Sequence, residues 1–316
     1  MRYKTVLQTI GRTPLVELQK IGKDLPAVFW VKLEAMNPGG SIKDRIGLRM
    51  IEAAEESGKL KPGATIIEAT AGNTGVGLAQ AAAAKGYKSL FVMPDKMSRE
   101  KADLLKAYGA TIVWTKTNVP PDHPEYYTNL AKKIASETPN SFVPSQFTNP
   151  NNPQTHYETT GPEIWEETGG KVDVLVAGVG TGGTISGCGR YLKEKNKKLK
   201  VVLADPPGSL LSGGDGSSWL VEGIGEDFFP ETYNKEIIDE IFQVTDKESF
   251  LMARRLTREE GLFVGGSSGT AMVAALKYAE KTKKKENIVV ILPDTGRNYL
   301  SKCHSDDWMR EKGFLE

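Results

Sequence analysis

The sequence predicts an α/β fold in which mostly parallel sheets are flanked by helices. Short runs rich in apolar and β-branched residues alternate with segments of helical periodicity, which is the pattern of βαβ units. Several of these runs, such as Val172–Val179, are almost entirely apolar, as expected of strands that are covered on both faces. Polar, glycine-rich turns follow several of the runs, as they do where parallel sheets bind ligands.

Each element is expected from its own pattern. The strands are expected at Val28–Leu33, Thr65–Ala69, Ser89–Met93, Thr111–Thr115, Val172–Val179, Val201–Asp205 and Ile288–Leu292. The helices are expected at Ile42–Ser57, Thr74–Lys85, Arg99–Tyr108, Pro124–Glu137, Gln154–Thr168, Gly183–Lys193, Lys247–Glu260 and Thr270–Lys281. Thr245 and Glu248 form a capping-box pattern, and Gly109 and Gly261 are placed to end helices.

Composition limits the classes of function. The 316 residues are 39% hydrophobic and 26% charged, which is ordinary for one large domain or two lobes. The 41 Lys and Arg balance the 40 Asp and Glu, so no basic excess indicates nucleic acid or an anionic membrane as a partner. No apolar run approaches the roughly 20 residues of a membrane-spanning helix, and the N-terminus lacks a signal-peptide core.

Cysteine and histidine are scarce. Cys188 and Cys303 stand far apart in no paired motif, which favours a reduced, cytoplasmic setting. His123, His156 and His304 show no metal-ligand spacing, and with two cysteines they do not make a usual zinc site. The sequence therefore predicts no metal centre.

A glycine-rich turn follows the expected strand Val172–Val179 and opens the next helix, with the residues Gly180, Thr181, Gly182, Gly183 and Thr184. Glycines let backbone N–H groups approach an anion, and the helix N-terminus adds positive potential. The turn suits a phosphate monoester. It also fits a dinucleotide fingerprint, with glycines at 178, 180 and 183 and Asp205 as the ribose-binding acid. A turn without a ligand is the third reading, and the motif alone does not choose among them.

Lys43 follows the sharp turn Pro38–Ser41 and stands in the first turn of an expected helix, beside an apolar face. A lysine that joins an aldehyde cofactor needs a weakly solvated position and a fixed approach. A surface lysine whose stem covers apolar residues is the commoner alternative. Taken with the glycine turns, Lys43 favours lysine-bound pyridoxal phosphate and an enzyme of amino acids. Asp44 and Arg45 are expected to make surface or domain contacts.

A second strand-to-helix turn, Thr70–Gly75, offers a place for a substrate carboxylate, with Asn73 available to a cofactor ring oxygen. Helix capping by Asn73 or Thr70 is the alternative. Gln146 is a further candidate for the carboxylate, because it follows a short possible strand.

A third turn, Gly265–Gly269, opens another expected helix. Ser267 or Ser268 is either a plain N-cap or a hydroxyl partner for a pyridine nitrogen. The structural reading is the commoner one for a serine at this position.

These motifs together resemble the fold-type II pyridoxal-phosphate enzymes that make cysteine and cystathionine, which are two-lobed and similar to the tryptophan synthase β subunit. The resemblance runs from Thr9 to Leu315, and its most specific marks are Asn37–Arg45, Glu68–Gly75, Met93–Ser98, Gly180–Thr184 and Gly265–Gly269. It implies a larger lobe of residues 1–44 and 147–316 that binds the cofactor phosphate, and a smaller mobile lobe of residues 45–146 with the carboxylate turn. It also implies a homodimer.

The resemblance also implies roles for single residues. Lys43 would carry the cofactor and act on the Cα proton of the substrate, Asn73 would contact the ring oxygen, and Ser267 would face the pyridine nitrogen. The phosphate would be held by Gly180, Thr181, Gly182, Gly183 and Thr184. The substrate would be held by Thr70, Ala71, Gly72, Asn73, Thr74, Gln146, Tyr157 and Gly223. Family members usually carry serine where Ala71 stands, so this departure is expected to weaken substrate closure or to shift substrate preference.

Within the family, His156–Thr160, Val221–Gly225 and Arg297–Lys302 are more similar to cystathionine β-synthase. The reaction implied is β-replacement, in which L-serine and L-homocysteine give L-cystathionine through an aminoacrylate. Cysteine synthase, acting on O-acetylserine and sulfide, is the alternative, and hydrogen sulfide release is a side activity of either.

The haem-binding extension and the regulatory tandem domain of longer members are absent, so no haem is expected. An NAD-dependent dehydrogenase and a non-catalytic scaffold are the readings from other classes.

Overall fold

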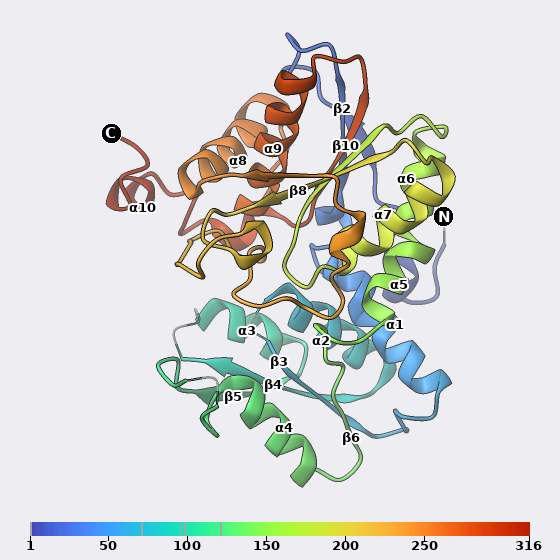
Figure 1. Cartoon of the computed structure of the whole chain (residues 1–316). Helices are drawn as coiled ribbons and strands as arrows, with labels where there is room; N and C mark the ends of the chain where they lie inside the picture. Colours follow the sequence, from blue (N-terminus) through green and yellow to red (C-terminus); the bar gives the residue numbers. More distant parts are fainter. Residues whose placement is uncertain (1, 71, 96, 98, 121) are drawn as a thin grey trace. The chain divides into compact units, whose positions relative to one another are not determined.

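The computed structural model describes residues 2–70, 72–95, 97, 99–120 and 122–316 (Figure 1). The chain divides into two compact units, one formed by Met1–Ile10 and Asn37–Asn152 and the other by Gly11–Met36 and Pro153–Glu316. We call them the first and the second unit. Within the described residues, no helix has both the length and the apolar character needed to cross a bilayer.

The first unit contains a four-stranded parallel sheet in the order β5-β4-β3-β6. Its strands are β3 (Thr65–Ala69), β4 (Lys88–Pro94), β5 (Thr111–Thr115) and β6 (Ser141–Phe142). Its helices are α1 (Lys43–Glu56), α2 (Asn73–Lys85), α3 (Arg99–Ala107) and α4 (Tyr127–Glu137). Ile66 and Phe91 pack with α1, α2 and α3, whereas Ile67 and Val92 pack with α4. Both faces of this sheet are therefore buried, which explains its nearly continuous apolar strands.

The second unit contains a six-stranded sheet in the order β1-β2-β10-β7-β8-β9, in which only the β1–β2 pair is antiparallel. Its strands are β1 (Leu15–Glu17), β2 (Val28–Leu33), β7 (Val174–Gly178), β8 (Lys200–Asp205), β9 (Glu240–Gln243) and β10 (Asn287–Leu292). Figure 1 shows helices on both faces of this sheet: α6 (Thr160–Glu167) and α7 (Gly183–Lys195) on one, and α8 (Asp246–Glu260) and α9 (Gly266–Thr282) on the other.

Shorter elements complete the chain. The helix α5 (Asn151–Glu158) begins at the end of the first unit and continues into the second, and α10 (Asp306–Glu311) lies near the C-terminus. Turns of 3-10 helix occur at Val6–Thr9, Glu34–Met36, Leu210–Ser212, Lys235–Ile237 and Gly296–Tyr299.

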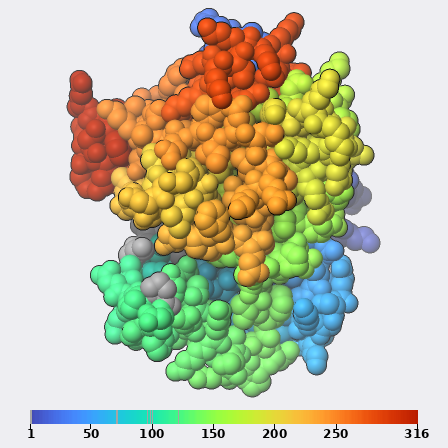
Figure 2. Space-filling view, viewed as in Figure 1, coloured from blue at the N-terminus to red at the C-terminus, as the bar shows by residue number. Residues whose placement is uncertain are grey.

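The C-terminal segment, red in Figure 2, packs at the edge of the second unit against a separate apolar cluster. The ring of Phe250 in α8 lies 5.4 Å from that of Trp308 and 5.6 Å from that of Phe314, measured between centroids. Val221 and Ile224 belong to the same cluster. The segment after α10 is therefore tied to the loop that contains Gly223.

The predicted fold class is confirmed. Of the seven predicted strands, three have the predicted bounds and four differ by one or two residues at their ends. The capping box at Thr245 is present, and Gly261 and Gly109 have the left-handed φ of 74° and 88° that favours glycine. The strands β1 and β6 were missed because they have only 3 and 2 residues. The edge strand β9 and the six-residue α10 were also missed.

Two helix predictions were wrong. The expected single helix Gln154–Thr168 is two helices, α5 and α6, which meet at Thr159 with φ −125° and ψ −71°. The helix expected from Thr270 begins four residues earlier, at Gly266. Its N-cap is Gly265, so neither Ser267 nor Ser268 is a cap.

The two units differ from the predicted lobes at their boundaries. Residues 2–10 pack with the first unit, because Leu7 joins the core beneath α1 and α2. The turn at residues 37–40 also belongs there, since the Gly39 N–H donates to the Asp44 carboxylate at the start of α1. Residues 147–152 stay with the first unit, where the Asn152 side chain donates to the Gln146 carbonyl at 2.8 Å.

Candidate functional site

The turn between β7 and α7 is enclosed by neighbouring chain on two sides. A Cβ added to Gly180 would lie 2.5 Å from the carbonyl oxygen of Gly223, and one added to Gly182 would overlap Tyr233. Gly182 is the N-cap of α7 with φ +83°, and no side chain caps the helix. The Thr232 hydroxyl donates to the Thr181 carbonyl and fixes the turn from outside. The backbone therefore forms a glycine-lined cradle of the kind that binds a phosphate at a helix N-terminus.

The structure brings three of the predicted groups of the second unit to one edge of its sheet. The turn after β7 carries the cradle, with Gly223 against it. The strand β10 is parallel to β7 and adjacent to it, and Asp294, just after β10, contacts Gly265 at the start of α9. Ser267, 5% exposed, is in the first turn of α9. The neighbouring Ser268 hydroxyl is buried without a hydrogen-bond partner among the described residues.

Tyr157 does not join this group. Its hydroxyl donates to Glu194 at 2.6 Å, and the guanidinium of Arg190 lies 3.9 Å from the centroid of its ring. Glu194 is close to the C-terminal end of α7, whereas Thr184 is in the first turn. The structure thus directs Tyr157 away from the cradle.

In the first unit, Lys43 is the first residue of α1. Its backbone N–H donates to the Ser41 hydroxyl at 3.2 Å, and its side chain is half-buried. Asp44 and Arg45, predicted to make surface or domain contacts, are 0% and 3% exposed. The surface part of that prediction is wrong, because the Asp44 carboxylate accepts the Gly39 N–H and closes the preceding turn from inside.

Two glycines bring α1 and α2 into backbone contact. A Cβ added to Gly47 would lie 2.5 Å from the carbonyl carbon of Gly77, and one added to Gly77 would lie 2.6 Å from the carbonyl oxygen of Lys43. Gly77 is one helical turn beyond Asn73, the first residue of α2. The first unit therefore holds the start of α1 close to the first turns of α2.

The turn after β3 is held by side chains. The N-cap of α2 is Gly72, with extended φ −110° and no side-chain hydrogen bond, so helix capping by Asn73 or Thr70 is not observed. The Gly72 N–H instead donates to the Thr70 hydroxyl at 3.3 Å. The Thr74 hydroxyl donates to Gln146 Oε1 at 2.6 Å, which brings Gln146 to this turn as predicted. Ala71 lies outside the described residues.

Glu68 supports the Gln146 segment from within the sheet. Its carboxylate is 6% exposed and accepts the N–H of Ser145 at 2.7 Å, where the backbone has the left-handed φ of 57°. Burial raises the pKa of Glu68 to about 7, and backbone N–H groups oppose part of this rise. One local signal indicates this role, namely an acidic residue within the strand Thr65–Ala69, whose other central residues are apolar.

A cavity of about 290 Å³ in the first unit lies elsewhere. It is lined by Met50, Ala54 and Lys59 on one side and by residues 142–145 and 148–151 on the other. None of the predicted site residues lines it.

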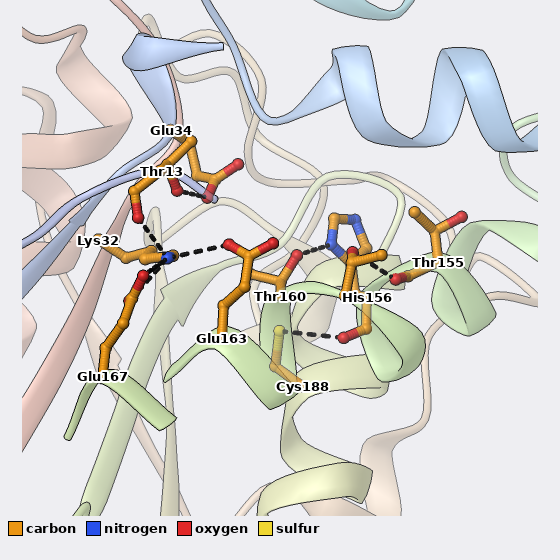
Figure 3. A network of polar contacts seen from close by, with 10 residues as sticks. Thr13, Lys32, Glu34, Thr155, His156, Thr160, Glu163, Glu167 and Cys188 are labelled. Carbon is orange, nitrogen blue, oxygen red and sulfur yellow. Dashed lines mark hydrogen bonds and ion pairs between the residues drawn. The ribbon is translucent and has the colours of Figure 1, made fainter. Parts of the chain in front are cut away.

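Sequence reasoning did not find the polar network of the second unit shown in Figure 3. The Lys32 ammonium in β2 is wholly buried and lies 3.0 Å from Glu163 Oε2 and 2.7 Å from Glu167 Oε2, both on α6. It also donates to the Thr13 carbonyl. Burial of this ammonium is tolerable because opposite charges surround it. Its two glutamate partners lie more than 130 residues away in the sequence, so no local pattern indicates them.

His156 continues this network toward the cradle. Its Nδ1 lies 3.0 Å from the Thr160 hydroxyl, and its Nε2 lies 3.3 Å from the Thr184 hydroxyl. Figure 3 shows the contact with Thr160 and the approach of the Cys188 thiol to the His156 carbonyl. His156, which sequence analysis considered only as a poor metal ligand and as part of the segment His156–Thr160, thus contacts the first turn of α7, next to the glycine-lined cradle.

The dinucleotide alternative requires a carboxylate that a ribose can reach. Asp205 is 0% exposed, and burial raises the pKa of its carboxyl to about 6. An acid that recognises a ribose has to be accessible, and this one is not.

Taken together, the fold and its turns define an α/β protein with a cradle for a phosphorylated ligand and a half-buried lysine at a helix start. Residues 6–294 match the family described as "Pyridoxal-phosphate dependent enzyme", and the chain belongs to this family. The dehydrogenase alternative is therefore wrong.

Several known proteins are similar to this chain. Cystathionine beta-synthases of Apis mellifera, Oryctolagus cuniculus and Dictyostelium discoideum are 49%, 50% and 49% identical over 98% of it. The chain spans 63%, 58% and 64% of their lengths. The crystal structure of a hydrogen sulfide-producing enzyme from Fusobacterium nucleatum matches with a TM-score of 0.89 and 40% identity, over 95% of this chain and all of that one.

Proposed function

We propose that the chain catalyses a pyridoxal-phosphate-dependent β-replacement, in which L-serine and L-homocysteine give L-cystathionine. The observation that carries this proposal is the identity of about one half to several cystathionine beta-synthases across 98% of the chain. The relatives are longer, so the proposal concerns the part of their sequence that this chain matches.

The residues of the cradle fit the proposed cofactor. A phosphate monoester needs several N–H donors and little steric bulk, and added Cβ atoms at Gly180 or Gly182 would meet neighbouring chain. We assign the phosphate to residues 180–184, with the Thr181 and Thr184 hydroxyls as further donors. When bound, pyridoxal phosphate supplies an aldehyde that joins an amine and a ring that withdraws electrons from the substrate Cα.

Lys43 is assigned both the covalent attachment and the movement of the Cα proton. Its half-buried position limits hydration of the ammonium, which favours the neutral amine that such chemistry requires. The closed turn before it and the backbone contact between α1 and α2 hold the residue in place.

The first turn of α2 is assigned to the substrate carboxylate, through Thr70, Gly72, Asn73 and Thr74 together with Gln146. The uncapped N-terminus of α2 favours a negative group, and the bond between Thr74 and Gln146 already links the two segments. Asn73 is assigned to the cofactor ring oxygen. Ala71 and Gly223 are included as neighbours of the substrate.

Ser267 is assigned to the pyridine nitrogen. A hydroxyl partner leaves that nitrogen uncharged, which favours elimination and replacement at Cβ over transamination. The position of Ser267 in the first turn of α9, at the sheet edge that carries the cradle, supports this assignment.

The proposal is tested with Lys43→Ala and with Lys61→Ala, an exposed lysine of the same unit, as the matched control. We expect Lys43→Ala to keep the far-UV circular dichroism of the wild type and to lose cystathionine formation, while Lys61→Ala retains it. Formation of cysteine from O-acetylserine and sulfide at a rate orders of magnitude above cystathionine formation would show that the proposed substrates are wrong. Unchanged turnover in Lys43→Ala would reject the catalytic role of the lysine.

A second activity is supported by a separate observation. The solved structure that matches with 40% identity belongs to a hydrogen sulfide-producing enzyme whose full length this chain covers. We propose that L-cysteine can replace L-serine as the donor, so that its thiol leaves as hydrogen sulfide. A sulfide electrode with L-cysteine, in the presence and absence of L-homocysteine, measures this activity directly.

We further propose that the protein works in the cytoplasm as a homodimer on amino acids and thiols, without nucleic acid, membrane or haem. Two features of the sequence support the setting and the partners: Cys188 and Cys303 stand far apart in no paired motif, and the net charge is +1. Light scattering measures the oligomeric state, and an absorption spectrum of the purified protein detects haem.

A further inference from the structure

The ring of His156 is fixed between three helices of the second unit. It is wholly buried, and both of its nitrogens meet threonine hydroxyls, Thr160 on α6 and Thr184 on α7. The helices α5 and α7 approach closely here, because a Cβ added to Gly187 would overlap the Pro153 carbonyl and lie 2.8 Å from His156 Cβ. The imidazole therefore has one defined place relative to the first turn of α7.

We propose that His156 is a positioning residue, which donates its Nε2–H to Thr184 and thereby directs the Thr184 hydroxyl proton at the phosphate of the bound ligand. The inference rests on the proposed function in one respect, namely that the cradle holds a phosphate.

The direction of the hydrogen bonds follows from proton counting. A threonine hydroxyl has one proton to donate, and a phosphate offers only acceptors at its charged oxygens. If Thr184 donates to the phosphate, its oxygen has to accept from His156, so Nε2 carries a proton. Nδ1 then accepts from the Thr160 hydroxyl. The neutral Nε2–H tautomer is the only neutral form that satisfies this order, since the Nδ1–H tautomer would take the Thr184 proton for itself.

Thr160, at the far end of this chain of hydrogen bonds, belongs to a helix that ion pairs hold in place. Thr160, Glu163 and Glu167 are spaced at i, i+3 and i+7 along α6, which places them on one face of the helix. The two glutamates hold the buried Lys32 ammonium at 3.0 and 2.7 Å. The ion pairs fix α6 against β2, so Thr160 is held at the distance that His156 requires.

Two amide substitutions at His156 distinguish the roles of its two ring nitrogens. In His156→Gln the amide nitrogen can reach the position of Nε2, whereas in His156→Asn it reaches only that of Nδ1. Loss of a hydrogen bond that serves a charged group weakens binding by about tenfold. We therefore expect His156→Asn to bind pyridoxal phosphate about tenfold more weakly than the wild type, and His156→Gln to stay within about threefold of it.

The probes are pyridoxal phosphate, inorganic phosphate and pyridoxal, added to the cofactor-free protein and followed by calorimetry. Pyridoxal lacks the phosphate, so its affinity is expected to be the same in all three proteins. Thr184→Val is expected to bind both pyridoxal phosphate and inorganic phosphate more weakly. In the double variant, His156→Asn is expected to weaken binding by less than about a further twofold, because the two residues act through one hydrogen bond. A general loosening of the fold would instead weaken pyridoxal as well and would add to Thr184→Val.

The tautomer is read in the wild type by nitrogen-15 NMR of histidine-labelled protein with phosphate bound. The chain has three histidines, so the His156 signal is the one that remains when the other two are assigned by their loss in His123→Gln and His304→Gln. The Nε2–H form is expected, and the Nδ1–H form would overturn the proposal even if neither His156 variant folds. Tight binding of inorganic phosphate without binding of pyridoxal phosphate would reject the proposed function and leave this inference standing. Equal affinities of His156→Asn and the wild type for both phosphates would reject the inference and leave the function standing.

Discussion

The turn after β7 and the turn after β3 both join a parallel strand to a helix through glycine, yet the chain surrounds them differently. Added Cβ atoms at Gly180 and Gly182 would meet Gly223 and Tyr233, whereas none of the described residues beyond the chain neighbours lies within 4 Å of one added to Gly72. Gly182 also has φ +83°, and Gly72 has φ −110°. The two glycine turns therefore differ in their surroundings: neighbouring chain encloses the turn after β7, whereas the turn after β3 has space beside its polar side chains.

The supports behind the two turns also differ in charge. The β7 turn is linked through His156 to a helix that two ion pairs of the buried Lys32 ammonium hold against β2. The segment of Gln146, which meets the β3 turn, rests on the single buried carboxyl of Glu68. Paired charges stay ionised when buried, whereas a lone carboxyl resists ionisation. The second support is therefore expected to respond to pH.

The largest contrast is expected from alanine at the two N-caps. Gly182→Ala has to adopt a left-handed backbone and displace Tyr233, so it is expected to lower the free energy of unfolding by about 4 kcal/mol. Gly72→Ala is expected to lower it by less than about 1 kcal/mol. Urea unfolding followed by circular dichroism measures both, and equal losses would remove the distinction between the turns.

A somewhat smaller effect is expected from Glu68→Gln, and it depends on pH. Because burial raises the folded-state pKa of Glu68 to about 7, from the 4.5 that is usual for a glutamate, the folded protein keeps a proton that the unfolded chain has released. The stability of the wild type relative to the variant should therefore fall as pH rises from about 4.5 to about 7, by about 3 kcal/mol in total, and stay constant above.

Urea unfolding at a series of pH values from about 4.5 to about 8 covers the expected window and checks this slope. The exposed Glu137, in α4 of the same unit, provides the control variant Glu137→Gln. A difference between the wild type and Glu68→Gln that does not change with pH would show that the carboxyl is ionised throughout.

The smallest effect is expected at the bond that joins α2 to the Gln146 segment. Thr74→Val removes the hydroxyl that donates to Gln146 at 2.6 Å, so it is expected to cost about 1 kcal/mol of stability. Thr74→Ser keeps the hydroxyl and is expected to stay close to the wild type. If valine, which keeps the methyl group and lacks only the hydroxyl, is as stable as the wild type, the hydrogen bond to Gln146 does not stabilise the protein.

Local patterns predicted much of the fold because both sheets are buried on two faces and their strands are strongly apolar. The turns at 70–75 and 180–184 were found for the same reason, since glycine after a buried strand is a local signal. The break between α5 and α6 was missed because Thr159 is not a helix-breaking residue type. Residues such as Lys32, Glu68 and His156 could not be placed, because their partners are set by the packing of distant segments.

Phe250 has a further consequence. Its ring lies 2.8 Å from a Cβ added to Gly266, at the start of α9, and the other side of the ring cluster is formed by Trp308 and Phe314. The C-terminal residues thus pack against, and support, the helix that bears Ser267 and the loop that contains Gly223. A substitution that loosens this cluster is therefore expected to disturb the segments proposed above to bind the ligand, although the cluster residues 308 and 314 lie far from them along the chain.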